Sequence, residues 1–262
     1  MIVFLHLPKT GGTSLHKLLV DYVGPERVYP ERFNDWQKYE RGKIDSYRLV
    51  SAHMSWENVE RLPKPRRVVT LLREPRSRIL SLYYFWRSHP IQEGISLPRP
   101  EFAKRHTLLE FLQTDNEDIR EYIENAMAAQ LVGQHYTSKY RGSSKGVKVI
   151  ESRAKARLLE LTSFGLLERM DESVSRILES LGISPPAVTP HLNSLEWVAA
   201  EAGTTHIRRE PISPQISMEL DRVTTIDRPI YEYAQQIFDN GARWEDRRQL
   251  LYWKLREMLW GI

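Results

Sequence analysis

The chain has 262 residues, no cysteine and a formal net charge of +4. Its length accommodates one substantial core, and the missing cysteines exclude disulfides and thiolate metal sites. The weak positive charge gives no reason to expect nucleic acid as a partner, and no apolar run approaches the roughly 20 residues that cross a bilayer. We therefore expect one domain over residues 1–262, cytoplasmic and without stable membrane insertion.

The first 90 residues predict strands that alternate with helices. The apolar stretch Met1–Leu7 predicts a buried strand, and leucines at helical spacing then predict a helix that ends at Gly24. Tyr47–Ala52 and Arg67–Leu72 predict two further strands, and periodic apolar residues predict a helix over Ser77–Arg87. This alternation favours an α/β fold with a central parallel sheet.

The middle of the chain predicts a mixture of loops and helices. Ser88–Pro100 holds three prolines and predicts an irregular loop, long enough to suggest a functional role. Thr107 and Glu110 have the spacing of a capping box at the start of a helix, and Glu117–Leu131 predicts another helix. The basic, Gly/Ser-rich stretch Lys139–Lys148 predicts a mobile surface loop.

The last third of the chain predicts one more strand, followed mainly by helices. Ser163–Glu168 predicts the strand, and Asp171–Leu181 predicts the helix after it. A long connection over Ser184–Pro214 leads to two or three predicted helices within Ile216–Trp260. The whole pattern predicts a single P-loop-like α/β domain, with a central parallel sheet flanked by helices and a helical C-terminal portion.

The loop Pro8–Ser14 has the residue types of an anion-binding site. It lies between the first predicted strand and the first predicted helix, whose unpaired N–H groups and positive dipole end favour an anion. Gly11 and Gly12 let the backbone approach an oxyanion closely, and Lys9 adds a full positive charge. Hydroxyl donors come from Thr10, Thr13 and Ser14. The alternative is a plain strand-to-helix turn, against which the lysine and the position after the strand both argue.

The order of residues in this loop excludes two common nucleotide-binding motifs. A Walker A sequence ends in Gly-Lys-[Ser/Thr], whereas Lys9 precedes both glycines, and the GxGxxG spacing of dinucleotide enzymes is absent. A P-loop nucleotide kinase or NTP hydrolase is nevertheless the alternative function, which magnesium-dependent ATP turnover would support. A third hypothesis is a catalytically silent module that binds anionic glycans.

Two segments together resemble a known family. His6–Ser14 resembles the 5′-phosphosulfate-binding loop of the sulfotransferases, and is most similar to the carbohydrate branch that includes the heparan sulfate 2-O-sulfotransferases. Leu71–Tyr84 resembles the second half of that signature, a strand ending in arginine with a serine eight residues later on the next helix. The resemblance implies that Arg73 and Ser81 bind the 3′-phosphate of the donor 3′-phosphoadenosine-5′-phosphosulfate (PAPS), whose product is 3′-phosphoadenosine-5′-phosphate (PAP).

Sulfuryl transfer from PAPS to a hydroxyl acceptor needs a base and a group that stabilises the leaving 5′-phosphate. We expect Lys9 to stabilise the leaving phosphate. His53 is the candidate base, because it follows a predicted strand and lies in Ser51–Trp56, which resembles the segment with the catalytic histidine of the 2-O-sulfotransferases. A structural histidine is the alternative for His53, and Glu57 is the reserve base. We expect no metal, because a sulfuryl group carries less charge than a phosphoryl dianion.

Later segments carry a fainter resemblance to the carbohydrate sulfotransferases. The similar segments are Glu124–Gly133, Phe164–Asp171 and Asp227–Ala234. The family usually closes the donor site with a late loop, for which the candidates are Asn193, Ser194, Arg208 and Arg209. The resemblance also implies a saccharide hydroxyl as the acceptor.

Several other polar residues have structural interpretations beside functional ones. We expect Arg76 and Arg78 to be solvated charges on a helix face, with contact to the nucleotide as the alternative for either, and His6 to be a satisfied core residue. His16, on the second turn of the first predicted helix, is open to either interpretation. Basic side chains that would suit an acidic saccharide, or would equally be ordinary solvated residues, are Arg87, Lys104, Arg105, Lys139, Arg141 and Lys145.

Overall fold

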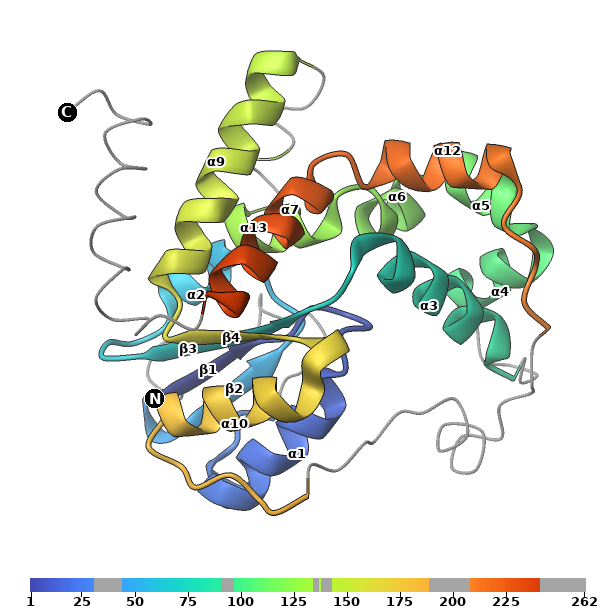
Figure 1. Cartoon of the computed structure of the whole chain (residues 1–262). Helices are drawn as coiled ribbons and strands as arrows, with labels where there is room; N and C mark the ends of the chain where they lie inside the picture. The colour runs from blue at the N-terminus through green and yellow to red at the C-terminus, as the bar shows by residue number, and fades with distance from the viewer. Residues whose placement is uncertain (31–43, 91–96, 134–136, 138–142, 189–207, 241–262) are drawn as a thin grey trace.

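Four parallel strands form the central sheet, in the order β2-β1-β3-β4 (Figure 1). The strands are β1 (Ile2–Leu5), β2 (Leu49–Ala52), β3 (Arg67–Leu72) and β4 (Ser163–Leu166). Nearly all their residues are buried, as is usual for parallel strands covered on both faces. The computed structural model describes residues 1–30, 44–90, 97–133, 137, 143–188 and 208–240.

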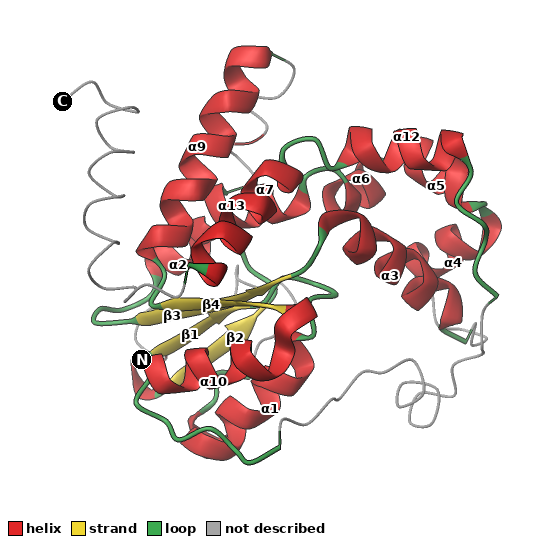
Figure 2. Ribbon diagram, in the orientation of Figure 1, coloured by secondary structure: helices red, strands yellow, loops and turns green. Residues whose placement is uncertain are grey.

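Helices cover both faces of this sheet (Figure 2). One face is covered by α1 (Gly12–Val23) and α10 (Met170–Ser180), which pack on Phe4, Val69 and Leu71. The opposite face is covered by α2 (Trp56–Arg61), α7 (Ala126–Val132), α9 (Ser144–Glu160) and α13 (Asp227–Asp239). The α/β class with a parallel sheet flanked by helices is thus confirmed.

A second group of helices packs beside the sheet around its own buried cluster. These helices are α3 (Pro75–Ser88), α4 (Pro98–Arg105), α5 (Leu108–Gln113), α6 (Glu117–Ile123) and α12 (Pro214–Val223). Short 3-10 turns are η1 (Pro25–Arg27), η3 (Ile44–Ser46) and η4 (Leu167–Arg169). Because only two residues separate the end of β3 from the start of α3, this helix joins the sheet to the second cluster.

Three expectations about the middle of the chain are wrong. The predicted helix Glu117–Leu131 breaks into α6 and α7, because Asn125 adopts a left-handed conformation (φ 51°) and donates its N–H to the carbonyl of Val223. The predicted loop Lys139–Lys148 becomes helix from Ser144, where the Ser143 side chain accepts from the Gly146 N–H. The predicted loop Ser88–Pro100 ends early, because Pro98 occupies the first turn of α4, where proline is favoured.

Other expectations are confirmed. Arg67–Leu72 is a strand over the predicted residues, and the Thr107–Glu110 capping box starts α5. The first, second and fourth strands form where predicted but are shorter. The predicted helical segment Ile216–Trp260 contains α13 and most of α12. Residues 241–260 of that predicted tail lie outside the described residues.

The strand order fixes where a ligand site can form. β1 connects through α1 to β2 on one side, while β3 lies on the other side of β1. Ligands of open α/β sheets bind at such a switch point, beyond the carboxyl ends of the strands. The switch point between β1 and β3 is therefore the place to look for a ligand site.

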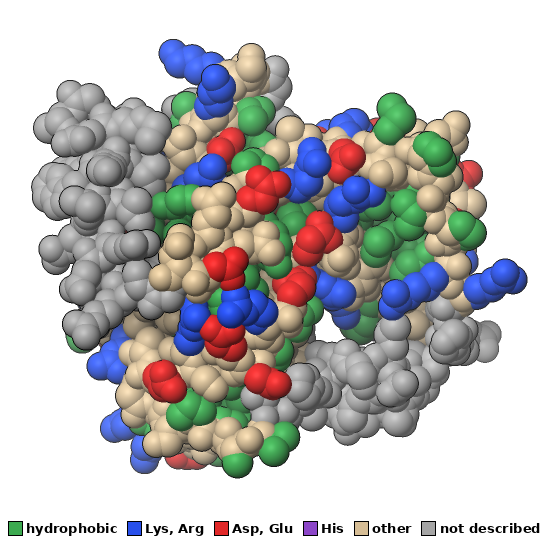
Figure 3. Space-filling view, in the orientation of Figure 1, with side chains coloured by type: hydrophobic (Ala, Val, Ile, Leu, Met, Phe, Trp, Pro, Cys, Tyr) green, Lys and Arg blue, Asp and Glu red, His purple; other side chains and the backbone are tan. Residues whose placement is uncertain are grey.

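The face of the molecule in Figure 3 carries interspersed acidic and basic side chains rather than a patch of one sign.

Candidate functional site

The loop after β1 has a strained backbone that a buried hydrogen bond holds in one conformation. Lys9 has φ 68° and Gly11 has φ 79°, both in the left-handed region. The buried Thr10 hydroxyl donates to the Leu7 carbonyl (2.8 Å) and so fixes the turn between them. Non-glycine residues adopt positive φ rarely, and such residues gather at ligand sites. The conformation at Lys9 therefore marks this loop as a candidate site.

The glycines of the loop are required by packing inside the protein. A Cβ atom on Gly12 would lie 2.2 Å from the His6 ring and 2.9 Å from Cζ of Phe4. A Cβ atom on Gly11 would lie 2.5 Å from a side-chain carbon of Leu167. The start of α1 can therefore approach β1 because Gly12 lacks a side chain, and it can approach η4 because Gly11 lacks one.

The start of α1 is open to an anion. Gly11 is the N-cap residue and supplies no side-chain hydrogen bond to the first turn. Thr13 lies half-buried in that turn, and Ser14 is buried. Uncapped N–H groups at a helix start, with the positive end of the helix dipole, bind phosphate and sulfate groups well. The local geometry at the start of α1 therefore suits the oxyanion that the sequence predicts there.

Positive charges crowd together at the switch point. Arg73 directly follows β3, and its guanidinium Nη1 donates to the Lys9 carbonyl (3.1 Å). Burial, and next the charge of Arg73, lower the pKa of Lys9 to about 7. Burial likewise lowers the pKa of Arg73, and Arg209 contributes in the same direction. A site where cations destabilise one another's charge gains most from an anionic ligand.

Helix α3 forms one wall of this cationic site. Lys9 Nζ lies 3.5 Å from the centre of the Phe85 ring. The half-buried Ser81 lies one turn before Phe85, so both project from the same face of α3. The two predicted 3′-phosphate residues, Arg73 and Ser81, are thus carried by the end of β3 and the helix that follows it.

Acidic residues fix the junction between β3 and α3. The Glu74 carboxylate caps α3 by accepting from the N–H groups of Arg76 and Ser77. Glu168 accepts from the Glu74 N–H (2.9 Å) and from the Tyr231 hydroxyl (2.6 Å). Both carboxylates favour the charged form of Arg73, although burial outweighs them. This arrangement fixes the backbone next to Arg73 and places two negative charges near its guanidinium.

Among the late-loop candidates, the structure brings Arg209 to the site. Although Arg208 and Arg209 are both exposed, the Arg209 guanidinium lies 5.9 Å from the Tyr84 ring centre and acts on the pKa of Arg73. Glu210 anchors this segment, because it accepts from the Tyr83 hydroxyl (2.7 Å) and its N–H donates to the Tyr84 hydroxyl (2.7 Å). The other two candidates, Asn193 and Ser194, lie outside the described residues.

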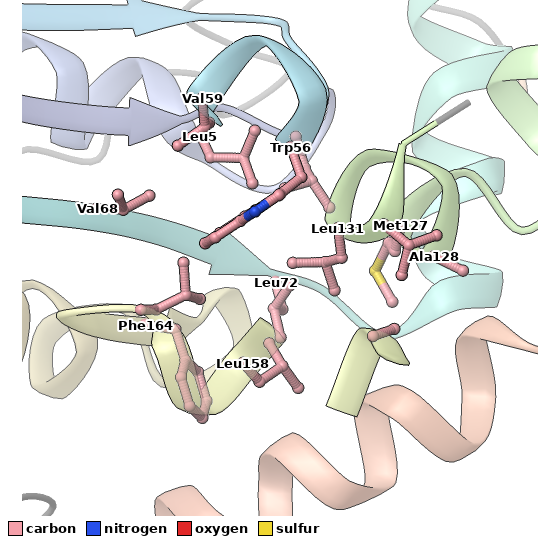
Figure 4. Close-up of a cluster of buried hydrophobic side chains, with 14 of the residues drawn as sticks. Leu5, Trp56, Val59, Val68, Leu72, Met127, Ala128, Leu131, Leu158 and Phe164 are labelled. Carbon is pink, nitrogen blue, oxygen red and sulfur yellow. The ribbon is translucent and has the colours of Figure 1, made fainter. Parts of the chain in front are cut away.

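His53 lies just beyond the carboxyl end of β2, next to the phosphate loop. Its ring meets the His6 ring edge-on at 4.6 Å, and His6 stacks on Phe4 at 5.0 Å. His6 is 6% exposed, so its expected core position is confirmed. Three residues after His53, Trp56 begins α2 and is buried in the core beside Leu131 of α7 (Figure 4).

A cavity of about 320 Å³ opens beside His53. Its described lining comprises Pro8, His53, Met54, Ser55, Asn58, Arg78, Arg99, Glu121, Tyr122, Ala126, Ala129 and Gln130. Because Pro8 and His53 both line it, the cavity lies between the phosphate loop and the candidate base. An acceptor molecule in this cavity would have its hydroxyl within the region that both elements border.

Two arginines of α3 differ from expectation. Arg78 is not solvated: it is 1% exposed, lines the cavity, and donates from Nη2 to the Tyr122 carbonyl (2.8 Å). Arg76 is half-buried, and it donates to the Ser217 hydroxyl and forms an ion pair with Asp221. Both therefore hold α3 against other elements, which is the physical reason that they are not free surface charges.

The remaining candidates occupy structural positions. Nδ1 of His16 shares a hydrogen bond with the buried Ser51 hydroxyl (2.8 Å). Glu57 packs against α7, because a Cβ atom on Gly133 would lie 2.5 Å from its carboxylate. Arg87 donates to the Tyr83 hydroxyl and to two backbone carbonyls, and so braces α3 against α4.

The other basic residues considered for a saccharide do not gather at the cavity. Arg105 pairs with Glu101 on α4, Lys104 is half-buried on the same helix, and Lys145 is exposed at the start of α9. Lys139 and Arg141 lie outside the described residues. None of the described members of this set lines the cavity beside His53.

Sequence reasoning missed Phe85 and Glu210. Phe85 could have been found, because it lies four residues after Ser81 and so on the same helix face. Glu210 carries no such signal, since its partners Tyr83 and Tyr84 lie more than 120 residues earlier in the chain. In the described part of the chain, no cluster of three metal-ligating side chains and no helix long and apolar enough to cross a membrane is found.

Comparison with known proteins adds one positive result. The family model of the sulfotransferase domain matches residues 7–197, which include the phosphate loop, His53, Arg73 and Ser81. The match ends before Arg209. The search of curated proteins found no match to the chain.

Proposed function

Because the chain belongs to the sulfotransferase domain family, we propose that it transfers the sulfuryl group of PAPS to a hydroxyl group of a carbohydrate acceptor, with His53 as the general base. The observation that carries this proposal is the convergence of Lys9 and Arg73 at the switch point, with the His53 cavity on the other side of the same loop. A donor bound on the cations and an acceptor in the cavity would meet at the loop.

The donor site divides between two elements. The loop and the start of α1 would bind the 5′-phosphosulfate, using Lys9, Thr10, Gly11, Gly12, Thr13 and Ser14. The Thr10 hydroxyl already bonds to the Leu7 carbonyl, so its contribution is to hold the loop rather than to donate to the ligand. Arg73 and Ser81 would bind the 3′-phosphate, and Arg209 would add a third cation.

The transfer step is an in-line displacement at sulfur. The acceptor oxygen forms a bond to sulfur while the bond from sulfur to the 5′-phosphate oxygen breaks, and the acceptor proton passes to His53. Lys9 stabilises the charge that develops on the leaving phosphate. Its half-buried position beside Phe85 supports this role, because electrostatic stabilisation is stronger away from bulk water.

Calorimetric titration with PAP, in the absence of magnesium, tests the donor half of the proposal. We expect micromolar binding that weakens at least about tenfold, or 1.4 kcal/mol, in Arg73→Ala. The matched control is Arg27→Ala, an exposed arginine next to Glu26 on η1, for which affinity should stay unchanged. Absence of PAP binding by the folded protein, together with magnesium-dependent affinity for ATP, would overturn the proposal in favour of a nucleotide kinase or NTP hydrolase.

A further inference from the structure

Helix α3 presents an aromatic ring to the lysine of the phosphate loop. Nζ of Lys9 lies 3.5 Å from the centre of the Phe85 ring, within the range of a cation–π contact. Resting on the proposed function, we infer that Phe85 is a positioning residue for Lys9. Its ring holds the ammonium group at the place where the leaving 5′-phosphate of the donor requires a positive charge.

The backbone of Lys9 does not by itself decide where the ammonium group lies. The left-handed backbone (φ 68°) and the hydrogen bond from Arg73 to the Lys9 carbonyl (3.1 Å) fix only the start of the side chain. The four-carbon stem beyond it is flexible and could carry the ammonium group in several directions. Within the described part of the chain, this group has no hydrogen bond and no ion pair. The contact with the Phe85 ring is therefore the one that restricts it there.

A ring suits this task better than a carboxylate would. A carboxylate beside Lys9 would compete with the phosphate for the ammonium group and would repel the anionic donor. The face of an aromatic ring attracts a cation through its quadrupole but carries no net charge. Phe85 can therefore hold the lysine in the free protein and still leave its full charge available to the donor.

The ring also opposes the effects that remove the proton from Lys9. Burial, and next the charge of Arg73, lower the pKa of Lys9 to about 7. Contact with the face of a ring favours the charged form of an amine and so raises its pKa. Without the Phe85 ring, the lysine would therefore lose its proton at a lower pH.

The end of α3 fixes the orientation of the Phe85 ring. His89, the C-cap residue, meets the ring edge-on at 4.4 Å, and its Nδ1 shares a hydrogen bond with the Phe85 carbonyl (2.7 Å). Phe85 also packs against the buried cluster of the second group of helices. Ser81, proposed for the 3′-phosphate, lies one turn earlier on the same helix. The same face of α3 would thus act at both phosphates of the donor.

A second phenylalanine of this cluster provides a matched control. Phe102, near the end of α4, also packs against the cluster and is also followed four residues later by a histidine. Its ring lies 3.9 Å from that of His106, whose Nδ1 shares a hydrogen bond with the Phe102 carbonyl (2.8 Å). Among the described residues, no lysine lies over the Phe102 ring. Replacing Phe102 therefore removes a ring of the same cluster without touching Lys9.

Calorimetric titration with PAP, on single and double variants, tests the inference. Phe85→Leu should weaken PAP binding about three- to tenfold at pH 8, because leucine keeps an apolar side chain but has no π face. Phe85→Tyr, which keeps the ring, and Phe102→Leu should each stay within about twofold of wild type. In a Lys9→Met background, Phe85→Leu should have no further effect, because the ring then has no charge to hold.

The pH dependence of PAP affinity supplies a measurement that a loss of packing alone would not change. In Phe85→Leu, the affinity should begin to fall at a pH about half a unit or more below that of wild type. An equal loss of affinity in the wild-type and Lys9→Met backgrounds would overturn the inference, as would an unshifted pH profile. Either result leaves the proposed function standing, whereas absence of PAP binding by the wild-type protein would overturn both.

Discussion

Asn125 and Asp227 each cap the helix that carries the other. Asn125 precedes α7 and accepts, through Oδ1, from the N–H groups of Ile226 (2.7 Å) and Asp227 (3.3 Å) at the start of α13. Asp227 is the first residue of α13, and its carboxylate accepts from the N–H groups of Met127 (3.2 Å) and Ala128 (2.8 Å) in α7. This reciprocal arrangement fixes α7, which lines the cavity beside His53, to a helix 100 residues later in the chain.

The first prediction concerns this pair of caps. Asp227→Ala should lower the free energy of unfolding by about 2–3 kcal/mol, because two buried N–H groups lose their acceptor and the buried Arg78 loses a compensating charge. Asp227→Asn should cost less, since an amide oxygen can still accept. Urea unfolding measures both, with the exposed Asp115→Ala as control. Equal stability of Asp227→Ala and wild type would contradict the stabilising role of the Asp227 cap on α7.

The second prediction concerns Gly12. Gly12→Ala should destabilise the fold by about 1–3 kcal/mol and abolish PAP binding, because its Cβ would displace the His6 ring and the start of α1. Gly182→Ala is the comparison: Gly182 has a left-handed backbone (φ 72°), which strains an alanine there, but a Cβ atom on it meets no atom within 4 Å. We expect Gly182→Ala to bind PAP normally. Thermal unfolding and calorimetry distinguish the two variants.

The third prediction concerns the proton on Lys9. Its pKa of about 7 in the free protein should rise when an anion binds, because the ligand stabilises the charged form. Well below pH 7 the lysine of the free protein is mostly protonated. Above pH 7 it is mostly neutral, so that binding of the anion must be accompanied by proton uptake at Lys9. PAP affinity should therefore fall between pH 7.5 and 9, by at most about tenfold per pH unit. Lys9→Ala should remove this slope, and a slope that persists in it would rule out Lys9 as its origin.

The fourth prediction separates Arg209 from its neighbour. Arg209→Ala should weaken PAP binding at least about tenfold, because the charge of Arg209 acts on Arg73. Arg208→Ala should change the affinity less than about twofold, because Arg208 is not among the charges that act on Arg73. Glu210→Ala should imitate Arg209→Ala, since Glu210 holds the segment against Tyr83 and Tyr84. A larger loss of PAP affinity in Arg208→Ala than in Arg209→Ala would show that Arg208, and not Arg209, contacts the nucleotide.

The fifth prediction tests the general base. His53→Gln should lower the sulfation rate at least about a hundredfold while PAP affinity stays within about twofold, because the base contacts the acceptor and not the donor. Glu57→Gln serves as the comparison, since Glu57 packs on α7 at Gly133. If the loss of activity occurred in Glu57→Gln instead, the reserve base would replace His53.

Short-range patterns in the sequence predicted most of the sheet and its loops. The β-branched run Arg67–Leu72 became β3 over the same residues, and the order strand, glycine loop, helix placed Lys9 at the carboxyl edge of the sheet. The serine eight residues after Arg73 lies on the helix that follows β3, as predicted. These features depend on residues close together in the chain, which local propensity and spacing describe well.

Features that depend on distant partners escaped prediction. The burial of Arg78 needs the Tyr122 carbonyl and Asp227, 44 and 149 residues later, so its charge alone suggested a solvated position. The break at Asn125 likewise depends on Val223, because helix propensity over Glu117–Leu131 gives no warning of it. The cavity itself is formed by segments separated by up to 120 residues, and no local pattern specifies such a void.

The ring contacts from Phe4 through His6 to His53 have a consequence for engineering this protein. Gly12 lies against one edge of the His6 ring, and His53 lies against that same ring. A bulkier or smaller residue in place of His6 would therefore disturb the start of α1 and the His53 imidazole at the same time, and with them both the proposed donor site and the proposed base. Attempts to change the proposed acceptor should therefore alter cavity residues on α6 and α7 and leave His6 unchanged, so that the start of α1 keeps its packing.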